Sequence, residues 1–514
     1  MPTFSGRVEA RMTVPTGGAA ISATVANGAG AQTVTVPAGN FYMTSAGGVS
    51  SLPTTLQTQL NGTAALQGFP RTAAATASAI GYGTWTTGAC WLMQEASGSL
   101  VATYGSPTLT ASGLTYQTTG SQSGDYAIGF STTGAEADGG DVFDVTGTDD
   151  VIVAWVGKFT STPGSTRGVI SKLSTGAGWQ VNFDSGSGLY YFQGLDSTPS
   201  TLFTALGASI HSGSWHVGIA TIDRATGKAR IGTRSLAGSS SVASEVSTAA
   251  TSMANAVAFR VGERADNPAN APTELLLSAV YVVSGSGVAA GLSANMSTAL
   301  TTFANAINAA WTVSMSTSTG LVSIGWTGYA TPTWSLSWSS TALRDVMGFT
   351  ANITNVTTTQ TGTQQARGVW IPDCPLNIEG DPERAPLVSD ARSSMSPTGQ
   401  VITLVGNTYR RHRNVHWSHV PIAQVWDGEA TYENASWEEF FAETQLGLNS
   451  SWFTPGSLIQ IYYSNAGSDA LLGADATITG WSIIGITSIE PQKSVGDWTG
   501  LWRIELPQIV AAGS

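Results

Sequence analysis

Charged side chains are scarce in this chain of 514 residues. Asp, Glu, Lys and Arg make up 11% of it, against about 25% in an average soluble domain. The 33 acidic and 21 basic residues leave a formal charge of −12, which disfavours nucleic acid or an anionic membrane as the main partner. The polar surface must therefore come from Ser, Thr, Asn, Gln and Gly, a composition more typical of adhesins and virus structural proteins than of cytosolic enzymes.

Cysteine and long apolar runs are equally scarce. Two cysteines, Cys90 and Cys374, cannot frame a disulfide-dense scaffold, and we expect two unpaired buried thiols. The N-terminal stretch has no signal-peptide hydrophobic region, and no apolar run reaches the roughly 18 residues that a membrane span needs. These absences predict synthesis in the cytoplasm without membrane insertion, and they oppose a secreted lectin.

Sequence motifs for catalysis are absent as well. The chain contains no H-E-x-x-H, no paired C-x-x-C, no G-x-S-x-G and no Walker A motif. A pair of carboxylates could still serve a glycosidase, and sequence alone does not decide that point. We predict a protein that is not an enzyme and has no required cofactor.

What the sequence does contain is a dense series of short strands. The segment "VIVAWVGKF" (151–159) predicts a continuous apolar strand, and "DRATGKA" (223–229) predicts a hairpin turn between two others. Strands at this spacing, each ended by Gly, Asp, Ser or Thr, are typical of a β-sandwich. Residues 91–285 are therefore predicted to form a sandwich.

The flanking segments mix strands with a few helices. Alternation at Val8 and Ala10 predicts a half-buried strand, and residues 52–60 carry leucines on one helical stripe. Residues 61–89 resemble a linker or an extended cover segment, and residues 288–311 predict a helix of about five turns. Further helices are expected at "TALRDVMGF", ending at Gly348, and at "NASWEEFFAETQLG", where Ser436 and Glu439 form a capping box.

These patterns predict a discontinuous architecture. The sandwich of residues 91–285 is expected to be inserted in a β-rich α+β domain formed by residues 1–90 and 286–370. Residues 371–514 are expected to form a C-terminal β-rich domain. The predicted fold class is thus mainly β.

The middle segment resembles the laminin-G / concanavalin-A-like jelly-roll family. The resemblance rests on "GDVFDVTGTDDVIVAWVGKF" (140–159) and "GSWHVGIATIDRATGKARIGT" (213–233), and it covers about 195 residues. It implies contact with a glycan or protein, with calcium as a candidate cofactor. The weak candidate calcium loop consists of Glu136, Asp138 and Asp141, for which a solvated acidic loop is the competing interpretation.

The tryptophans of the middle segment have two interpretations. Trp155, Trp179 and Trp215 lie in predicted strands. Large aromatic side chains there either fill the sandwich core or stack on sugars. We expect them to fill the core, because alternating strands direct every second side chain inward.

The flanking segments resemble structural proteins of tailed bacteriophages, on "WSSTALRDVMGF" (338–349) and "GVWIPDCP" (368–375). The resemblance implies a virion structural protein, most simply of the tail or tail tip, assembled in the host cytoplasm. Expected partners are other virion proteins, further copies of the chain in a trimer or hexamer, and a host surface glycan or receptor. A capsid decoration protein and a polysaccharide-degrading tail enzyme are the alternatives.

An unusual basic stretch, "YRRHRNVHWSHV" (409–420), stands out in this acidic chain. A strand would separate His412 and His416 by roughly 13 Å, too far to share a metal ion. A nucleic-acid contact is disfavoured because the surrounding segment is acidic. We expect a strand whose arginines pair with carboxylates of a neighbouring subunit, and the predicted assembly contact consists of Arg410, Arg411 and Arg413.

Overall fold

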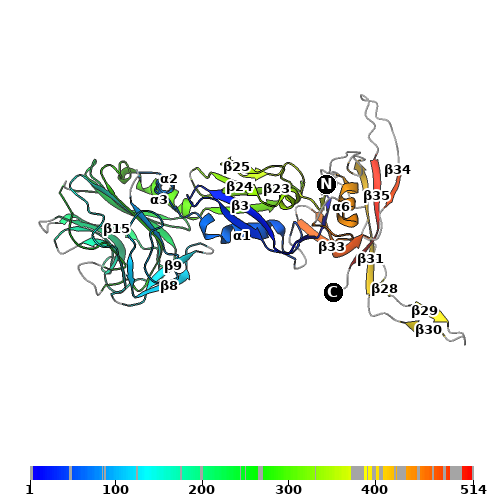
Figure 1. Ribbon diagram of the computed structural model, residues 1–514, viewed down its shortest axis with the longest axis horizontal. Coiled ribbons are helices and arrows are strands. Elements are labelled where there is room, and N and C mark those ends of the chain that lie inside the picture. Colours follow the sequence, from blue (N-terminus) through cyan, green and yellow to red (C-terminus); the bar gives the residue numbers. More distant parts are fainter. Residues whose placement is uncertain are drawn as a thin grey trace, which may run out of the picture.

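The computed structural model shows an elongated molecule with the sandwich at one end, a middle part that we call the shaft, and a sheet at the other end (Figure 1). The structure describes residues 4–371 except 45–48, 84, 86–87, 123–124, 133, 174–175, 197–200, 244, 249–250, 264–269 and 330. Beyond these it describes 387–389, 392–395, 401–404, 409–421, 424, 436–448, 452–465, 468–478, 482–486 and 501–511. Every helix within these ranges is too short or too polar to cross a bilayer.

Two antiparallel sheets form the sandwich. Sheet I runs in the order β15 (Thr201–Ser209), β14 (Leu189–Leu195), β13 (Gly178–Asp184), β12 (Arg167–Leu173), β20 (Arg260–Val261), β10 (Glu136–Asp138) and β7 (Thr110–Ser112). Sheet II runs in the order β18 (Ser240–Val242), β17 (Lys228–Ser235), β16 (His216–Asp223), β11 (Asp150–Phe159), β21 (Leu275–Gly285), β9 (Tyr126–Phe130) and β8 (Leu114–Thr119). Strands β19 (Val246–Ser247) and β6 (Ala89–Leu92) pair with β17 and β21. The prediction of a mainly β chain with a β-sandwich is confirmed.

Sheet II is apolar on both faces. On β11, Val151, Val153 and Trp155 belong to the core between the two sheets. The alternate residues Ile152 and Ala154 belong to a second core, which sheet II shares with the helices of the shaft. Burial on both faces explains why this strand is continuously apolar.

The core interpretation is confirmed for Trp155 and Trp179, which are fully buried between the sheets. Trp215 is partly buried and packs against the second core. The hairpin predicted at residues 223–229 is also confirmed, because it joins β16 to β17.

Helix α3 (Met296–Ile307) covers the outer face of sheet II together with α2 (Ala73–Ile80) (Figure 1). The ring of Phe303 on α3 meets that of Tyr281 on β21 edge to face, with centroids 5.8 Å apart. The carboxylate of Asp150 accepts the backbone N–H of Ala289 at 3.0 Å, a further tie between the sandwich and the segment before α3.

Two predictions for the segments around these helices are wrong. The helix predicted over residues 288–311 is shorter, because Gly291 adopts a left-handed backbone conformation and η2 (Ser293–Asn295) precedes α3. Residues 61–89 are neither a plain linker nor an extended segment, since they contain η1 (Ala64–Leu66) and the packed helix α2.

The shaft combines residues from before and after the sandwich. One sheet has the order β25 (Ile353–Val356), β24 (Trp334–Trp338), β3 (Ala19–Val25) and β4 (Gln32–Val36). A second sheet has the order β22 (Ala310–Met315), β23 (Val322–Thr327) and β26 (Gln360–Thr361). A third pairs β2 (Met12–Val14) with β5 (Gly39–Phe41). The pairing of β24 with β3 joins the two flanking segments. The predicted limits of the domains stay a prediction.

The helices expected in the shaft and beyond it are confirmed. Helix α1 (Leu52–Gly62) buries its leucine stripe. Helix α4 (Thr341–Val346) is followed by Gly348 at φ 76°. Helix α6 (Trp437–Leu446) begins with the predicted capping box.

The end sheet joins the first strand of the chain to its last strands. Its order is β27 (Val369–Trp370), β1 (Phe4–Ala10), β32 (Ile459–Asn465), β33 (Ser468–Ile478), β35 (Leu501–Ala511), β31 (Tyr409–Pro421) and β28 (Leu387–Ser389). Strand β34 (Ser482–Ile486) pairs with β35, and β29 (Arg392–Met395) pairs with β30 (Val401–Leu404). The pairing of β1 with β32 was not predicted, because an alternating pattern identifies a strand but not its partner.

Strand β1 is more deeply buried than its alternation predicts. Arg7 and Glu9, expected on a solvent face, are 3% and 0% exposed and form an ion pair of 2.5 Å. Thr44 donates its backbone N–H and its hydroxyl to Glu9, at 2.9 and 2.8 Å. The Arg7 guanidinium also lies over the ring of Tyr462, 4.1 Å from its centroid. The half-buried prediction is therefore wrong, because the partner strand and residue 44 cover the second face.

Of the two thiols, Cys90 is buried and free, as expected. Cys374 lies outside the described residues.

The packing of the sandwich core predicts that any side chain added at Gly218 destabilises the fold. This glycine on β16 faces Trp155, and a Cβ atom there would lie 2.1 Å from the indole ring. We expect Gly218→Ala to lower the free energy of unfolding by about 1–3 kcal/mol, because a rigid ring cannot yield. Urea denaturation followed by tryptophan fluorescence measures it. Gly164→Ala is the matched control, since Gly164 faces open space, and equal stability of the two variants would contradict the packing.

Candidate functional site

The register of sheet I lines up a row of polar side chains on its outer face. Directly paired residues of an antiparallel sheet share a face. The pairing runs from Asp138 to Arg260, then to Ser171, Gln180 and Gln193. Five neighbouring strands therefore each contribute one polar group to the same row.

A second polar row lies two residues further along the strands. Asn182 pairs with Tyr191, and Glu136 pairs with Ser112. We call the two rows together the polar face: Glu136, Asp138, Ser171, Gln180, Asn182, Tyr191, Gln193 and Arg260. The residues between these positions point the other way, since Ala137, Val181 and Phe192 belong to the sandwich core.

Two amide oxygens of the polar face lack hydrogen bonds. Gln180 Oε1 and Asn182 Oδ1 are buried and have no partner among the described residues. The amide nitrogen of Gln180 donates to Gln193 Oε1 at 2.9 Å, which fixes the orientation of both amides. A buried acceptor without a donor is costly, so a water molecule or a ligand hydroxyl is the natural partner for these oxygens.

An acidic cluster surrounds Arg260 at one end of the polar face. Arg260 Nη1 lies 2.9 Å from Glu136 Oε2 and 3.7 Å from Glu263 Oε1, and Arg260 Nε lies 3.5 Å from Asp138 Oδ2. One guanidinium thus forms ion pairs with three carboxyl groups. Burial, and secondarily the neighbouring Glu136, raises the pKa of Glu263 to about 7.

The three residues of the candidate calcium loop are divided between two cations. Glu136 and Asp138 lie at Arg260, whereas Asp141 pairs with Lys172 at 2.5 Å. Among the described residues, no group of three or more His, Cys, Asp or Glu side chains is placed to hold a metal ion. The geometry supports ion pairing here, and calcium binding stays a prediction.

Lys172 holds the base of the loop in which Asp141 lies. Its ammonium group is fully buried and also lies 3.3 Å from Asp144 Oδ1. It donates to the carbonyl oxygens of Val257 and Asn255 at 2.7 and 3.1 Å. A buried ammonium with this many acceptors has a structural role.

The basic stretch is a strand, as predicted. In β31, Arg411 pairs with Ala511 and with Leu387, and Arg413 pairs with Ile509. The side chains of Arg410, Arg411 and Arg413 lie outside the described residues, so their assembly role stays a prediction.

The sequence contained a signal for the polar face that the sequence-based predictions did not include. In "GWQVNFD", Gln180 and Asn182 alternate with core residues, and in "GLYYFQG" the same holds for Tyr191 and Gln193. Each strand alone shows a polar outer face. That the four side chains adjoin depends on the register between the strands.

Comparisons with known proteins give only distant similarity. No family model and no curated protein matches the chain. Among solved structures, Trypanosoma rangeli sialidase with the inhibitor DANA is similar at 11% identity and a TM-score of 0.26, over 38% of this chain and 30% of the sialidase. The binding domain of botulinum neurotoxin serotype D is similar at 8% identity and TM-score 0.28, over 83% and 78%. Lectin I-B4 from Griffonia simplicifolia is similar at 10% identity and TM-score 0.22, over 34% and 93%.

These neighbours are β-rich, and the chain spans less than a third of the sialidase. Similarity at these TM-scores does not identify a function. The sandwich is established by its own strand pairing.

The acidic cluster predicts a pH dependence of stability. The pKa of Glu263 is about 7 in the folded chain and 4.5 ordinarily, so the folded chain holds this proton more tightly. The free energy of unfolding should therefore fall as the pH rises from about 4.5 to about 7. Glu263→Gln should remove this part of the dependence in thermal denaturation between these pH values. Identical slopes for the variant and the natural chain would contradict the assignment.

Proposed function

We propose that this protein is a non-enzymatic structural protein of a tailed-bacteriophage virion, of the tail or tail tip, that presents its sandwich to a surface glycan. The observation that carries the proposal is the asymmetry of the sandwich. The outer face of sheet II is covered by α2 and α3, whereas the outer face of sheet I is polar. The polar face lies on the side of the sandwich opposite sheet II; Ser171 and Gln180 at its centre are buried, and Tyr191 and Gln193 are half-buried.

The chemistry of this face suits a sugar. Side-chain amides of Gln180, Asn182 and Gln193 can donate and accept hydrogen bonds with hydroxyl groups. Tyr191 adds an aromatic ring for the apolar side of a sugar. Two unsatisfied amide oxygens supply acceptors that a ligand hydroxyl would complete.

The charge of the face favours a neutral or amine-bearing glycan over an acidic one. Glu136, Asp138 and Glu263 surround a single Arg260. A sialylated or uronic-acid glycan would bring a further negative charge to this cluster, and like charges at a contact are unfavourable.

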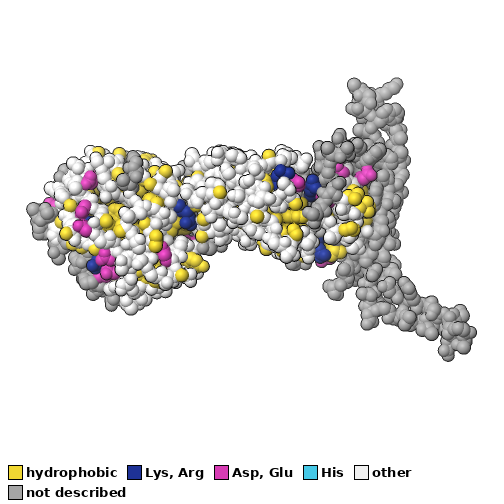
Figure 2. All heavy atoms as spheres, in the orientation of Figure 1, with side chains coloured by type: hydrophobic (Ala, Val, Ile, Leu, Met, Phe, Trp, Pro, Cys, Tyr) yellow, Lys and Arg dark blue, Asp and Glu magenta, His cyan; other side chains and the backbone are white. Residues whose placement is uncertain are grey.

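The virion role rests on the phage-like sequences and on the elongated architecture. The face of the shaft shown in Figure 2 carries few charged side chains. Side chains such as Ser, Thr and Gly lose little conformational entropy when they are ordered at a contact. This composition supports assembly with other virion proteins and with further copies of the chain as a trimer or hexamer.

A polysaccharide-degrading enzyme is the alternative of a different class. Glycosidases hold their two carboxyl groups roughly 5–9.5 Å apart. Glu136 and Glu263 instead lie 2.9 and 3.7 Å from the same Arg260 nitrogen, Nη1, so both carboxyl groups are engaged by one cation. This observation favours binding over hydrolysis.

A capsid decoration protein is the remaining alternative. Counting copies per particle distinguishes the two locations, because decorations occur in hundreds and tail-tip proteins in tens or fewer.

The glycan proposal is tested with the full chain on a glycan array followed by affinity titration. We expect binding to neutral or amine-bearing glycans and weaker binding to sialylated ones. Tyr191→Ala should lower the affinity about fivefold, because a stacked ring contributes on the order of 1 kcal/mol. Tyr126→Ala is the matched control, since Tyr126 is 40% exposed on sheet II.

Two outcomes would oppose the glycan proposal. Equal loss in both tyrosine variants would argue against the polar face. New reducing ends after incubation with capsular polysaccharide would argue for the enzyme.

The assembly proposal is tested by charge reversal on β31. Arg411→Glu combined with Arg413→Glu should reduce incorporation into particles severalfold, because the arginines are proposed to pair with carboxylates of a neighbouring subunit. Circular dichroism should show a folded monomer. Lys228→Glu combined with Arg234→Glu, on β17 of the sandwich, is the control and should assemble normally. Unchanged incorporation of the β31 variant would overturn the contact.

A further inference from the structure

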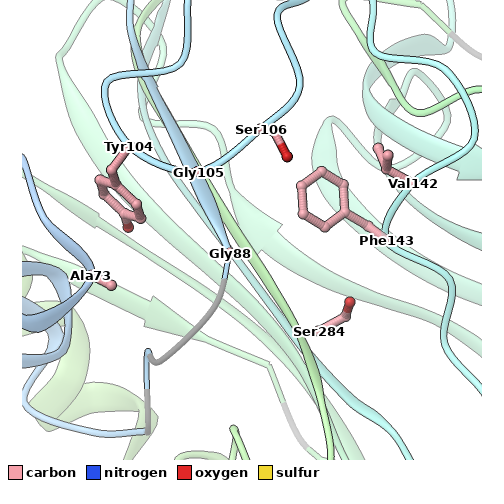
Figure 3. Close-up of a pocket in the computed structure, with 8 residues that line it drawn as sticks. All are labelled: Ala73, Gly88, Tyr104, Gly105, Ser106, Val142, Phe143 and Ser284. Carbon is pink, nitrogen blue, oxygen red and sulfur yellow. The ribbon is translucent and has the colours of Figure 1, made fainter.

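A pocket of about 510 Å³ lies where the sandwich meets α2 (Figure 3). This volume falls in the range of roughly 300–1,000 Å³ that is typical of small-molecule sites. The backbone of Gly88 and Gly105 lines it, and Ala73, the first residue of α2, lies at one side. We call it the rim pocket. It is separate from the polar face, because none of its lining residues belongs to that face.

Phe143 is held in the rim pocket in an unusual backbone conformation. Its φ is 62°, a left-handed value that is rare for a bulky residue. The Phe143 carbonyl accepts a hydrogen bond from Trp179 Nε1 at 3.2 Å. The edge-to-face contact with Phe259, at 5.1 Å between centroids, holds the ring. Backbone strain that the surroundings enforce is found preferentially at functional sites.

Two hydroxyl groups share the pocket with this ring. In Figure 3 the side chains of Ser106 and Ser284 point toward the space beside Phe143. No hydrogen bond to either hydroxyl is formed among the described residues, so both can bond to a ligand or to water. Tyr104 contributes its ring only, since its hydroxyl is engaged with Thr76 Oγ1 at 2.8 Å.

The lining carries no charge, so it suits a neutral ligand with an apolar side and several hydroxyl groups. We propose that the rim pocket is a second binding site, for one neutral sugar unit stacked on Phe143 and hydrogen-bonded to Ser106 and Ser284. A ligand there would touch the sandwich and α2 together. The inference does not depend on the glycan site at the polar face.

The experiment is ligand-observed saturation-transfer NMR on the full chain with four probes. These are the methyl glycosides of glucose, galactose, mannose and N-acetylglucosamine. We expect at least one to bind with millimolar affinity. Phe143→Gly should weaken it about tenfold, since it removes the ring while glycine accepts the left-handed conformation. Ser284→Leu should abolish binding by filling the space.

Tyr191→Ala separates this site from the polar face and should leave the rim-pocket affinity unchanged. Because the Phe143 ring also packs in the core, thermal denaturation of both pocket variants must show a folded chain. If the Phe143→Gly variant does not fold, the Ser284→Leu variant alone tests the proposal. Absence of binding by all four probes would overturn the proposal. Binding that survives Ser284→Leu and is lost in Tyr191→Ala would overturn it too, and would assign the sugar to the polar face.

Discussion

Burial of sheet II on both of its faces is the constraint on which the rest of the molecule depends. One face packs on sheet I through Val153 and Trp155, and the other packs on α3 through Ile152 and Tyr281. A sandwich connected to the shaft only through two segments of chain could rotate freely relative to it. Here a shared apolar core and the Asp150 carboxylate hold it to the shaft.

The same constraint explains where the two candidate sites lie. With sheet II covered, the polar rows of sheet I form the face that the sandwich directs outward, and they combine amides, hydroxyls and one aromatic ring. The rim pocket arises at the boundary itself, where loops of the sandwich approach the first residue of α2. Both candidate sites follow from the way in which one sheet serves two cores.

At the other end, Arg7 and Glu9 form a buried ion pair within β1, and Arg7 also lies over the ring of Tyr462 on β32. Removing one partner of such a pair leaves an uncompensated buried charge and typically costs about 3–5 kcal/mol. The neighbouring hydrogen bonds from Thr44 and the ring of Tyr462 offset the cost of burying the ions. Thr44 and Tyr462 lie outside β1, so their contacts favour the register of β1 that places both charges beside them.

The sequence by itself determined the local elements: the strands of the sandwich, the hairpin at 223–229, the capping box of α6 and the stripe of α1. Periodicity and cap chemistry are properties of neighbours in the chain, so they can be read from it. It did not determine that Arg7 and Glu9 are buried, that residues 73–80 pack as a helix, or that Gln180, Gln193 and Arg260 form one row. Only the tertiary structure decided these points, because strand partners, register and the covering of a face depend on residues far apart in the sequence.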